Sequence, residues 1–233
     1  DGITDRLQAL FAYDASSPLI FSSGLFLFLF AGFLLVYSAF RRAPMARIVY
    51  VIAFSLYFYY KSSGIYFLLL VFAAASDFLI ARGIYRARFR WTKRWLVVLS
   101  VAVNLGMLAY FKYTNFLIGN LNSLLSIFHT AIPKVSLVMP LGISFFTFQI
   151  TSYLIDVYTG KTRPARSILD LGVYLCMFPQ LISGPICMYS EIQPQLKNRR
   201  VDVRLLEEGM ETFVLGLSAK TLLANPMGGL WNN

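Results

Sequence analysis

Residues 18–40 form an uninterrupted stretch that contains no charged side chain. A helix rises about 1.5 Å per residue, so a stretch of this length covers the roughly 30 Å hydrocarbon core of a bilayer. Further apolar stretches follow at 48–60, 65–81, 96–111 and 135–158. Hydrophobic residues make up 58% of the chain and charged residues 14%, whereas a soluble domain carries roughly a quarter charged residues. The sequence therefore predicts an all-α, polytopic integral membrane protein with several transmembrane helices.

The segment before the first apolar stretch, residues 1–17, has a different character. Its apolar side chains Ile3, Leu7, Leu10 and Phe11 share one face of a helix, a pattern typical of a short helix that lies at the membrane surface. We expect two units, an interfacial N-terminal segment over 1–17 and a multi-helix transmembrane portion over 18–233. Within the second unit, the polar stretch 190–209 predicts another interfacial helix, since Val201, Leu205 and Met210 show a helical apolar pattern.

The basic residues predict the orientation in the membrane. Gaps 41–47 and 82–94 hold nine lysines and arginines, whereas gaps 61–64 and 112–134 hold three. Because the basic gaps of membrane proteins stay in the cytoplasm, the N-terminus is expected outside. The net charge of +10 would suit nucleic acid in a soluble chain, but its confinement to these gaps indicates the bilayer as partner and no nucleic acid.

The sequence "FPQLISGP", residues 178–185, interrupts an apolar stretch that would otherwise read as one more span. Proline removes a helical hydrogen bond and glycine weakens a helix, so a plain spanning helix would avoid both. A single crossing over 168–188 would also place the basic residues at 197–204 outside the cytoplasm. If the chain instead enters the membrane, breaks and returns to the same side, the basic residues that follow stay in the cytoplasm. Broken backbone at membrane depth requires protein or a water-filled cavity around it. We therefore predict a re-entrant segment that lines a cavity.

Polar side chains within the spans are candidates for function. Gln149, Ser152 and Asp156 form one polar stripe on the helix expected over 135–158, and Phe145 extends the same face. Two interpretations stay open, a lining of the substrate path and a structural hydrogen-bonding seam. Asp77 lies near a span end, where pairing between helices or snorkelling is expected, and Asn104 is expected to form an interhelical hydrogen bond.

The remaining chemistry-bearing residues predict no further site. His129 has no carboxylate or cysteine at a useful spacing, so an interfacial loop histidine is the better interpretation. Cys176 and Cys187 lack metal-ligand spacing. We expect no metal site, no bound cofactor and two small buried hydrophobic side chains.

The paired sequences "PLGISFFTFQITSYLIDVYTGK" (140–161) and "FPQLISGPI" (178–186) resemble a signature of the membrane-bound O-acyltransferase family, in its AlgI-like branch that O-acetylates alginate. "NLGMLAYFKYTNF" (104–116) and "GLSAKTLLAN" (216–225) resemble further segments of that family. The resemblance covers about residues 18–228 and corresponds to the N-terminal half of the family's proteins.

The resemblance implies transfer of an acetyl or other acyl group, with acetyl-CoA as donor, to hydroxyls of an extracytoplasmic polysaccharide such as alginate. It further implies a multi-pass protein of the bacterial inner membrane, with periplasmic acetylation proteins as possible partners. The residues expected to line the substrate path, by positioning rather than by proton transfer, are Gln149, Ser152, Asp156, Pro179, Gln180 and Pro185.

The family's catalytic histidine belongs to a later motif, and His129 does not match its context. No residue of this sequence is therefore assigned as catalytic, and residues 1–233 alone are expected to be inactive, because hydroxyl attack on a thioester needs a general base. Two other functions stay open. One is a catalytically inactive scaffold of a polysaccharide-modification complex, and the other is a transporter, for which the sequence shows no inverted repeat.

Overall fold

A computed structural model describes Tyr13, Phe21, Thr130 and the ranges 23–125, 132–181, 184–197 and 203–231. The interfacial helix expected over 1–17 lies outside the described residues except for Tyr13, and His129 lies outside them as well.

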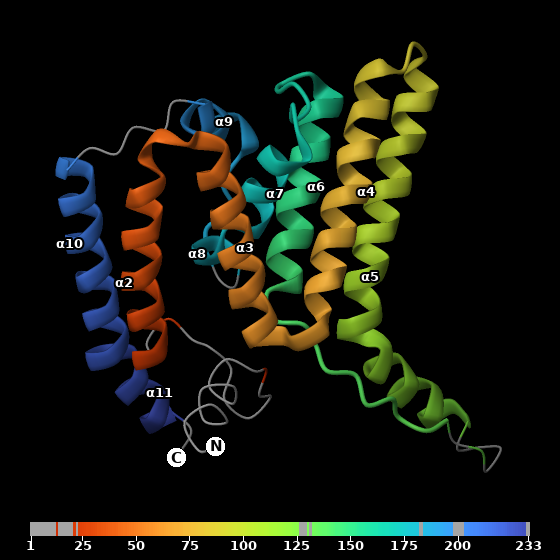
Figure 1. The fold of residues 1–233 in the computed structure, drawn as a ribbon. Coiled ribbons are helices and arrows are strands. Elements are labelled where there is room, and N and C mark those ends of the chain that lie inside the picture. The colour runs from red at the N-terminus through yellow and green to blue at the C-terminus, as the bar shows by residue number, and fades with distance from the viewer. Residues whose placement is uncertain are drawn as a thin grey trace, which may run out of the picture.

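Within these ranges the chain is helical and contains no strand. Two stretches, Pro44–Arg86 and Arg90–Leu125, are long and apolar enough to cross a bilayer, and this confirms an all-α membrane protein. The α-helices, shown in Figure 1, are α2 (Gly24–Ala39), α3 (Pro44–Ser63), α4 (Phe67–Arg86), α5 (Arg90–Leu125), α6 (Ile143–Thr159), α7 (Ile168–Cys176), α8 (Phe178–Leu181), α9 (Tyr189–Lys197), α10 (Val203–Ala219) and α11 (Asn225–Trp231).

The stretch Pro44–Arg86 is a hairpin. Gly64 ends α3 with a φ of 60°, a conformation that side-chain-bearing residues rarely adopt, and a short 3-10 turn, Gly64–Tyr66, leads into α4. The apolar stretches predicted at 48–60 and 65–81 are therefore two antiparallel helices, each a few residues longer than the sequence suggested.

The links α2–α3, α4–α5 and α6–α7 lie at the same end of the molecule, which we call the basic end (Figure 1). These links carry the basic gaps 41–47 and 82–94 and the basic residues Lys161, Arg163 and Arg166, so the structure places the basic links together as the charge count predicts. α2 begins at the opposite end.

Two clusters of buried apolar side chains hold the helices together. One joins α4, α5, α6 and α7 around residues such as Leu70, Ile150 and Leu154. The other, the phenylalanine cluster, joins α2, α3 and α8 through the rings of Phe26, Phe30, Phe33, Phe54, Phe58 and Phe178. α8 thereby ties the broken segment to α2 and α3.

A buried polar group joins α4 to α5. Asp77 is 1% exposed, and its two carboxylate oxygens accept hydrogen bonds from the Ser100 hydroxyl and, at 2.7 Å, from the Asn104 amide. The Asn104 amide also lies 3.2 Å from the Ser100 oxygen. The expected interhelical bond of Asn104 is confirmed, and Asp77 pairs helices rather than snorkelling.

Removing this carboxylate is expected to loosen the α4–α5 pair. Asp77→Ala removes the carboxylate that accepts from both the Ser100 hydroxyl and the Asn104 amide in an apolar interior, and should lower the free energy of unfolding in mixed micelles by about 1–2 kcal/mol. The double variant Asp77→Asn with Asn104→Asp exchanges the two groups. Its free energy of unfolding should be close to that of the wild type, because a donor and an acceptor again face each other. Ser76→Ala serves as the control, since the Ser76 hydroxyl bonds only the Ala73 carbonyl of its own helix. Equal effects of Asp77→Ala and Ser76→Ala would contradict the role of the group.

Two predicted span limits were wrong. α5 does not end near 111 but continues to Leu125, and residues 132–140 are extended, so α6 begins at Ile143 rather than at 135. Asn115 and Asn122 lie two turns apart on α5 and bind the extended segment. Asn115 bonds both the N–H and the C=O of Val135, and Asn122 bonds both of these groups of Ile132, at 2.7–3.1 Å. Gly142, with a φ of 76°, then turns the chain into α6.

The interfacial helix predicted over 190–209 was also wrong in its limits and its place. α9 ends at Lys197, and α10 runs from Val203 to Ala219 and continues through a π-helical turn, Lys220–Ala224, into α11. α10 lies along α2 rather than across the basic end (Figure 1). The Phe30 and Phe213 rings, 5.3 Å apart, form a contact between these two helices, although no residue of α10 is buried.

Candidate functional site

The segment from α7 to α9 enters from the basic end and returns to it. α7 starts there, with the Ser167 hydroxyl accepting the N–H of Asp170 at 3.1 Å, and leads inward to α8 (Figure 1). The Phe178 N–H, at the start of α8, donates to the Ser55 hydroxyl of α3 at 3.2 Å. α9 lies again at the basic end. The predicted re-entrant segment is therefore present, and its break falls at Met177, between α7 and α8.

The return begins with a tight turn around Gly184. Its N–H donates to the Gln180 carbonyl at 3.0 Å, and a Cβ at position 184 would lie 2.4 Å from Gln180 Cα. Only glycine allows the chain to pass this close to its own backbone, which explains why this residue stands between α8 and the outgoing chain.

Side chains of α6 and α7 bind the freed backbone groups. The Gln149 amide donates to the Tyr174 carbonyl at 2.9 Å, and the Tyr174 hydroxyl donates to the Cys187 carbonyl at 2.8 Å. Tyr153 of α6, Tyr174 and Tyr189 pack their rings edge to face or tilted, with centroids 5.1–6.3 Å apart. The break is therefore satisfied inside the protein, as broken backbone at this depth requires.

Two side chains of the site keep an unused acceptor atom among the described residues. Gln180 lies 3.5 Å from the Cys187 sulfur through its amide nitrogen, while its carbonyl oxygen is buried and unpaired. Asp156 pairs one carboxylate oxygen with Lys161 at 3.8 Å, while the other oxygen is buried and unpaired. A buried acceptor without a partner is costly, so both atoms are suited to bind a hydroxyl or amine of a ligand.

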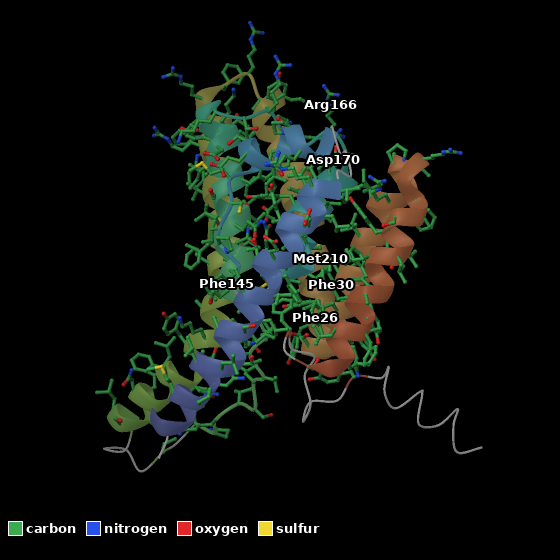
Figure 2. All side chains as sticks on the ribbon, turned by 90° about the vertical axis from the view of Figure 1, so that its left-hand side faces the viewer. Phe26, Phe30, Phe145, Arg166, Asp170 and Met210 are labelled. Carbon is green, nitrogen blue, oxygen red and sulfur yellow. The ribbon has the colours of Figure 1, made fainter. Side chains whose placement is uncertain are left out.

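The structure gathers the six predicted site residues only in part. Gln149 and Asp156 are buried, Ser152 and Gln180 are partly buried, and Pro179 and Pro185 are exposed. Gln149 bonds the backbone of α7 and not another side chain of the stripe. A bond between two helices is what a structural hydrogen-bonding seam would make. Phe145, placed by sequence on the same face, is exposed and lies on the flank away from Phe26 and Phe30 (Figure 2).

A cavity of about 320 Å³ opens between α2, α3, α8 and α9, and we call it the α2–α9 cavity. Pro179 is the member of the predicted set that lines it. The lining residues are Phe30, Phe33, Tyr37, Val51, Met177, Phe178, Pro179, Ile192, Gln195 and Leu196.

Sequence reasoning missed Ser55 and Tyr174, whose side chains hold the break. Ser55 stands alone in an apolar helix, and a hydroxyl there also bonds its own backbone, so nothing in the sequence distinguished it. Tyr174 lies in the apolar stretch just before the break, and nothing in the sequence there indicated a role for its hydroxyl.

Comparison with characterised sequences shows relatives over most of the chain. The chain is 34% identical to the "Probable alginate O-acetylase AlgI" of Pseudomonas aeruginosa over 91% of its own length and 41% of the relative's. The protein of the same name from Azotobacter vinelandii is 33% identical over 90% of this chain and 42% of its own length. The "Peptidoglycan O-acetyltransferase" of Helicobacter pylori is 30% identical over 89% and 45%.

The chain thus spans less than half the length of these curated relatives. No family model matches it, and no solved structure matches it. The relatives are alginate O-acetylases of the AlgI type and a peptidoglycan O-acetyltransferase, so this chain matches a portion of an AlgI-like membrane-bound O-acyltransferase.

Proposed function

We propose that this chain is the N-terminal portion of a membrane enzyme that O-acetylates an extracytoplasmic polysaccharide. The observation that carries the proposal is the relationship to AlgI proteins and to a peptidoglycan O-acetyltransferase over about nine-tenths of the chain. The fold supports it, because acetyl transfer across a membrane needs a place in the interior where broken backbone and polar groups are accommodated.

The donor and the acceptor approach this place from opposite ends. Acetyl-CoA, a polyanion, is the donor we propose, and the positive charge around the basic end favours its approach there. The acceptor is a polysaccharide, alginate or a polymer of similar hydroxyl chemistry, which approaches from the end where α2 begins. Bacterial inner-membrane location, with that end outside, and periplasmic acetylation partners belong to the same proposal.

The residues of this chain position the reactants. Gln149 holds the entering arm through the Tyr174 carbonyl, and Pro179 and Pro185 fix the course of the chain on both sides of the turn. The free Gln180 oxygen would accept a hydrogen bond from an acceptor hydroxyl, and the free Asp156 oxygen, one turn from the end of α6 at the basic end, offers a contact on the donor side. The acceptor hydroxyl oxygen bonds the acetyl carbon as the thioester C–S bond breaks. The hydroxyl proton goes to a general base, which the family resemblance assigns to a histidine of a later motif, and from there to the leaving CoA thiolate.

Gln180→Ala tests this assignment in the intact protein. The variant removes the unpaired acceptor and should lower the acetyl content of the exported polymer about tenfold, the loss expected for one hydrogen bond of about 1.4 kcal/mol. The acetyl content is measured on purified polymer, and membrane insertion is measured by the amount of protein in the membrane fraction.

Asn120→Ala is the control, because Asn120 is an exposed amide on α5, remote from the break. It should leave acetylation unchanged. Full acetylation with Gln180→Ala would remove Gln180 from the substrate path, and full acetylation in a strain that lacks the protein would refute the proposed function.

A further inference from the structure

α5 continues past the end of the helix bundle that lies opposite the basic end. The Tyr66 ring, in the turn between α3 and α4, lies 5.5 Å from the Phe111 ring of α5, so Phe111 marks the level of that turn. Residues 112–125 therefore lie beyond the start of α4 and extend α5 by about 21 Å. We call these residues, together with the extended segment 132–140, the α5 arm.

The helical part of the arm has one exposed apolar face. Asn115 and Asn122, on another side of the helix, are occupied by the extended segment. The apolar side chains follow one another at spacings of four, four and three residues, which keeps them on a single face. Each is between 46% and 65% exposed, and we call this set the arm stripe: Tyr113, Leu117, Leu121 and Leu124.

The arm stripe continues the lipid-facing side of α5. Val103, Tyr110 and Leu117 follow one another at intervals of seven residues, so they share one face of the helix. Val103 and Tyr110 are exposed, and because α5 is long and apolar enough to cross a bilayer there, they face lipid. Another side of α5 carries Ser100 and Asn104, which bind α4. One uninterrupted apolar face therefore runs from the span into the arm.

The direction of the arm keeps this face near the bilayer. In Figure 1 the last turns of α5 lean away from α4, and the extended segment runs beside them. A helix that leans away from α4 turns the side remote from α4 toward the bilayer, and that side carries the arm stripe. A straight helix of 36 residues, about 54 Å long, would instead carry the stripe out of a roughly 30 Å core and into water.

The charges of the arm suit a bilayer surface. Residues 112–125 and 132–140 contain two lysines, Lys112 and Lys134, and no acidic residue. Lys112 stands where α5 leaves the bundle, with its ammonium 5.6 Å from the centre of the Tyr113 ring. Tyrosine is enriched at this depth of a membrane, and a lysine there keeps its stem among apolar groups while its ammonium reaches the headgroups.

We propose that the α5 arm lies in the headgroup region of the leaflet opposite the basic end, with the arm stripe facing the acyl chains. The partner of the arm is the lipid surface, since the stripe continues the face that α5 already turns to lipid. An amphipathic helix in this position buries its apolar face without any further protein. This inference is independent of acetyl transfer, because it needs only the fold.

Spin labels on the intact protein in liposomes of phosphatidylethanolamine and phosphatidylglycerol test the proposal. Cys176→Ala and Cys187→Ser remove the native thiols, and Leu121→Cys or Ser123→Cys then carries a single nitroxide. Two positions along a helix separate these residues, so they lie on nearly opposite faces, and both are exposed. The ratio of collisions with oxygen, which dissolves in lipid, to collisions with a water-soluble nickel chelate should be several-fold higher at Leu121→Cys. Equal ratios at the two positions would show that the arm stands in water and would overturn the proposal.

Two further measurements separate lipid from protein as the occupant. Leu117→Gln with Leu121→Gln places two amides on the stripe and should raise the chelate collisions of a label at Leu124→Cys several-fold. Ser123→Gln, on the opposite face, is the control and should leave those collisions unchanged, and equal effects of the two changes would contradict the proposal. Oxidation of Leu121→Cys in the liposomes should leave the protein monomeric. Disulfide-linked dimers would assign the stripe to a second copy of the chain, and the lipid assignment would be wrong.

Discussion

Gly184→Ala is expected to disrupt the re-entrant segment and, with it, acetylation by the intact protein. The added methyl carbon would lie 2.4 Å from Gln180 Cα and 2.9 Å from the Gln180 carbonyl oxygen, and backbone atoms cannot rotate away. The turn must open, which lengthens the 3.0 Å hydrogen bond between these two residues. We expect a loss of about 3 kcal/mol or more in the free energy of unfolding and polymer acetylation below a tenth of normal. Unfolding in mixed micelles and the acetyl content of the polymer measure the two effects.

Gly172→Ala, in the entering arm, is the matched control. Its methyl carbon would meet the end of the Ile52 side chain at 3.4 Å, an ordinary contact, and alanine favours the helix more than glycine does by up to about 1 kcal/mol. We expect this variant to be as stable as the wild type or slightly more stable. A Gly184→Ala protein that melts and acetylates like Gly172→Ala would show that the close approach at Gly184 does not shape the site.

Phe178→Ala should have the second largest effect. The Phe178 ring lies among five others, with centroid distances of 5.2 Å to Phe54, 5.4 Å to Phe33 and 5.7 Å to Phe58, and with Phe26 and Phe30 at 6.1 and 6.0 Å. In lipid the loss of packing dominates, because the unfolded helices remain in an apolar solvent. We expect a loss of about 2–3 kcal/mol in the free energy of unfolding in mixed micelles, mainly from the cavity left behind.

Phe28→Ala removes the same ring from the exposed side of α2, where Phe28 is 81% exposed, and should change stability little. Because Phe178 joins the broken segment to α2 and α3, Phe178→Ala should also speed protease cleavage near residue 178. Equal stability of the two variants would contradict the anchoring role of the phenylalanine cluster.

The break itself could be predicted from sequence, because its cause is local. Pro179 and Gly184 interrupt a helix wherever they occur in an apolar stretch, and the basic residues on both sides require the chain to return. The anchors could not be predicted in the same way. Ser55 and Gln149 bond the broken backbone from helices that are adjacent only after folding, and a lone serine or glutamine in a span has many possible partners.

The limits of α5 and α6 were wrong for a different reason. The sequence predicted that the span ends near Phe111, where the apolar character falls, but a helix does not need lipid to continue. Asn115 and Asn122 stabilise the overhanging part by binding the extended segment that follows, a contact with no apolar signature. Hydropathy therefore marked the most apolar part of the helix and gave no information on its full length.

The Ser55–Phe178 hydrogen bond joins residues 123 positions apart, so its two partners are synthesised at very different times. At a rate of 5–20 residues per second, roughly 6 to 25 s pass between them. During this interval the segment that α3 will hold does not yet exist, and the Ser55 hydroxyl can bond the backbone of its own helix. The bond that fixes the break can therefore form only late in synthesis, when residue 178 has been made.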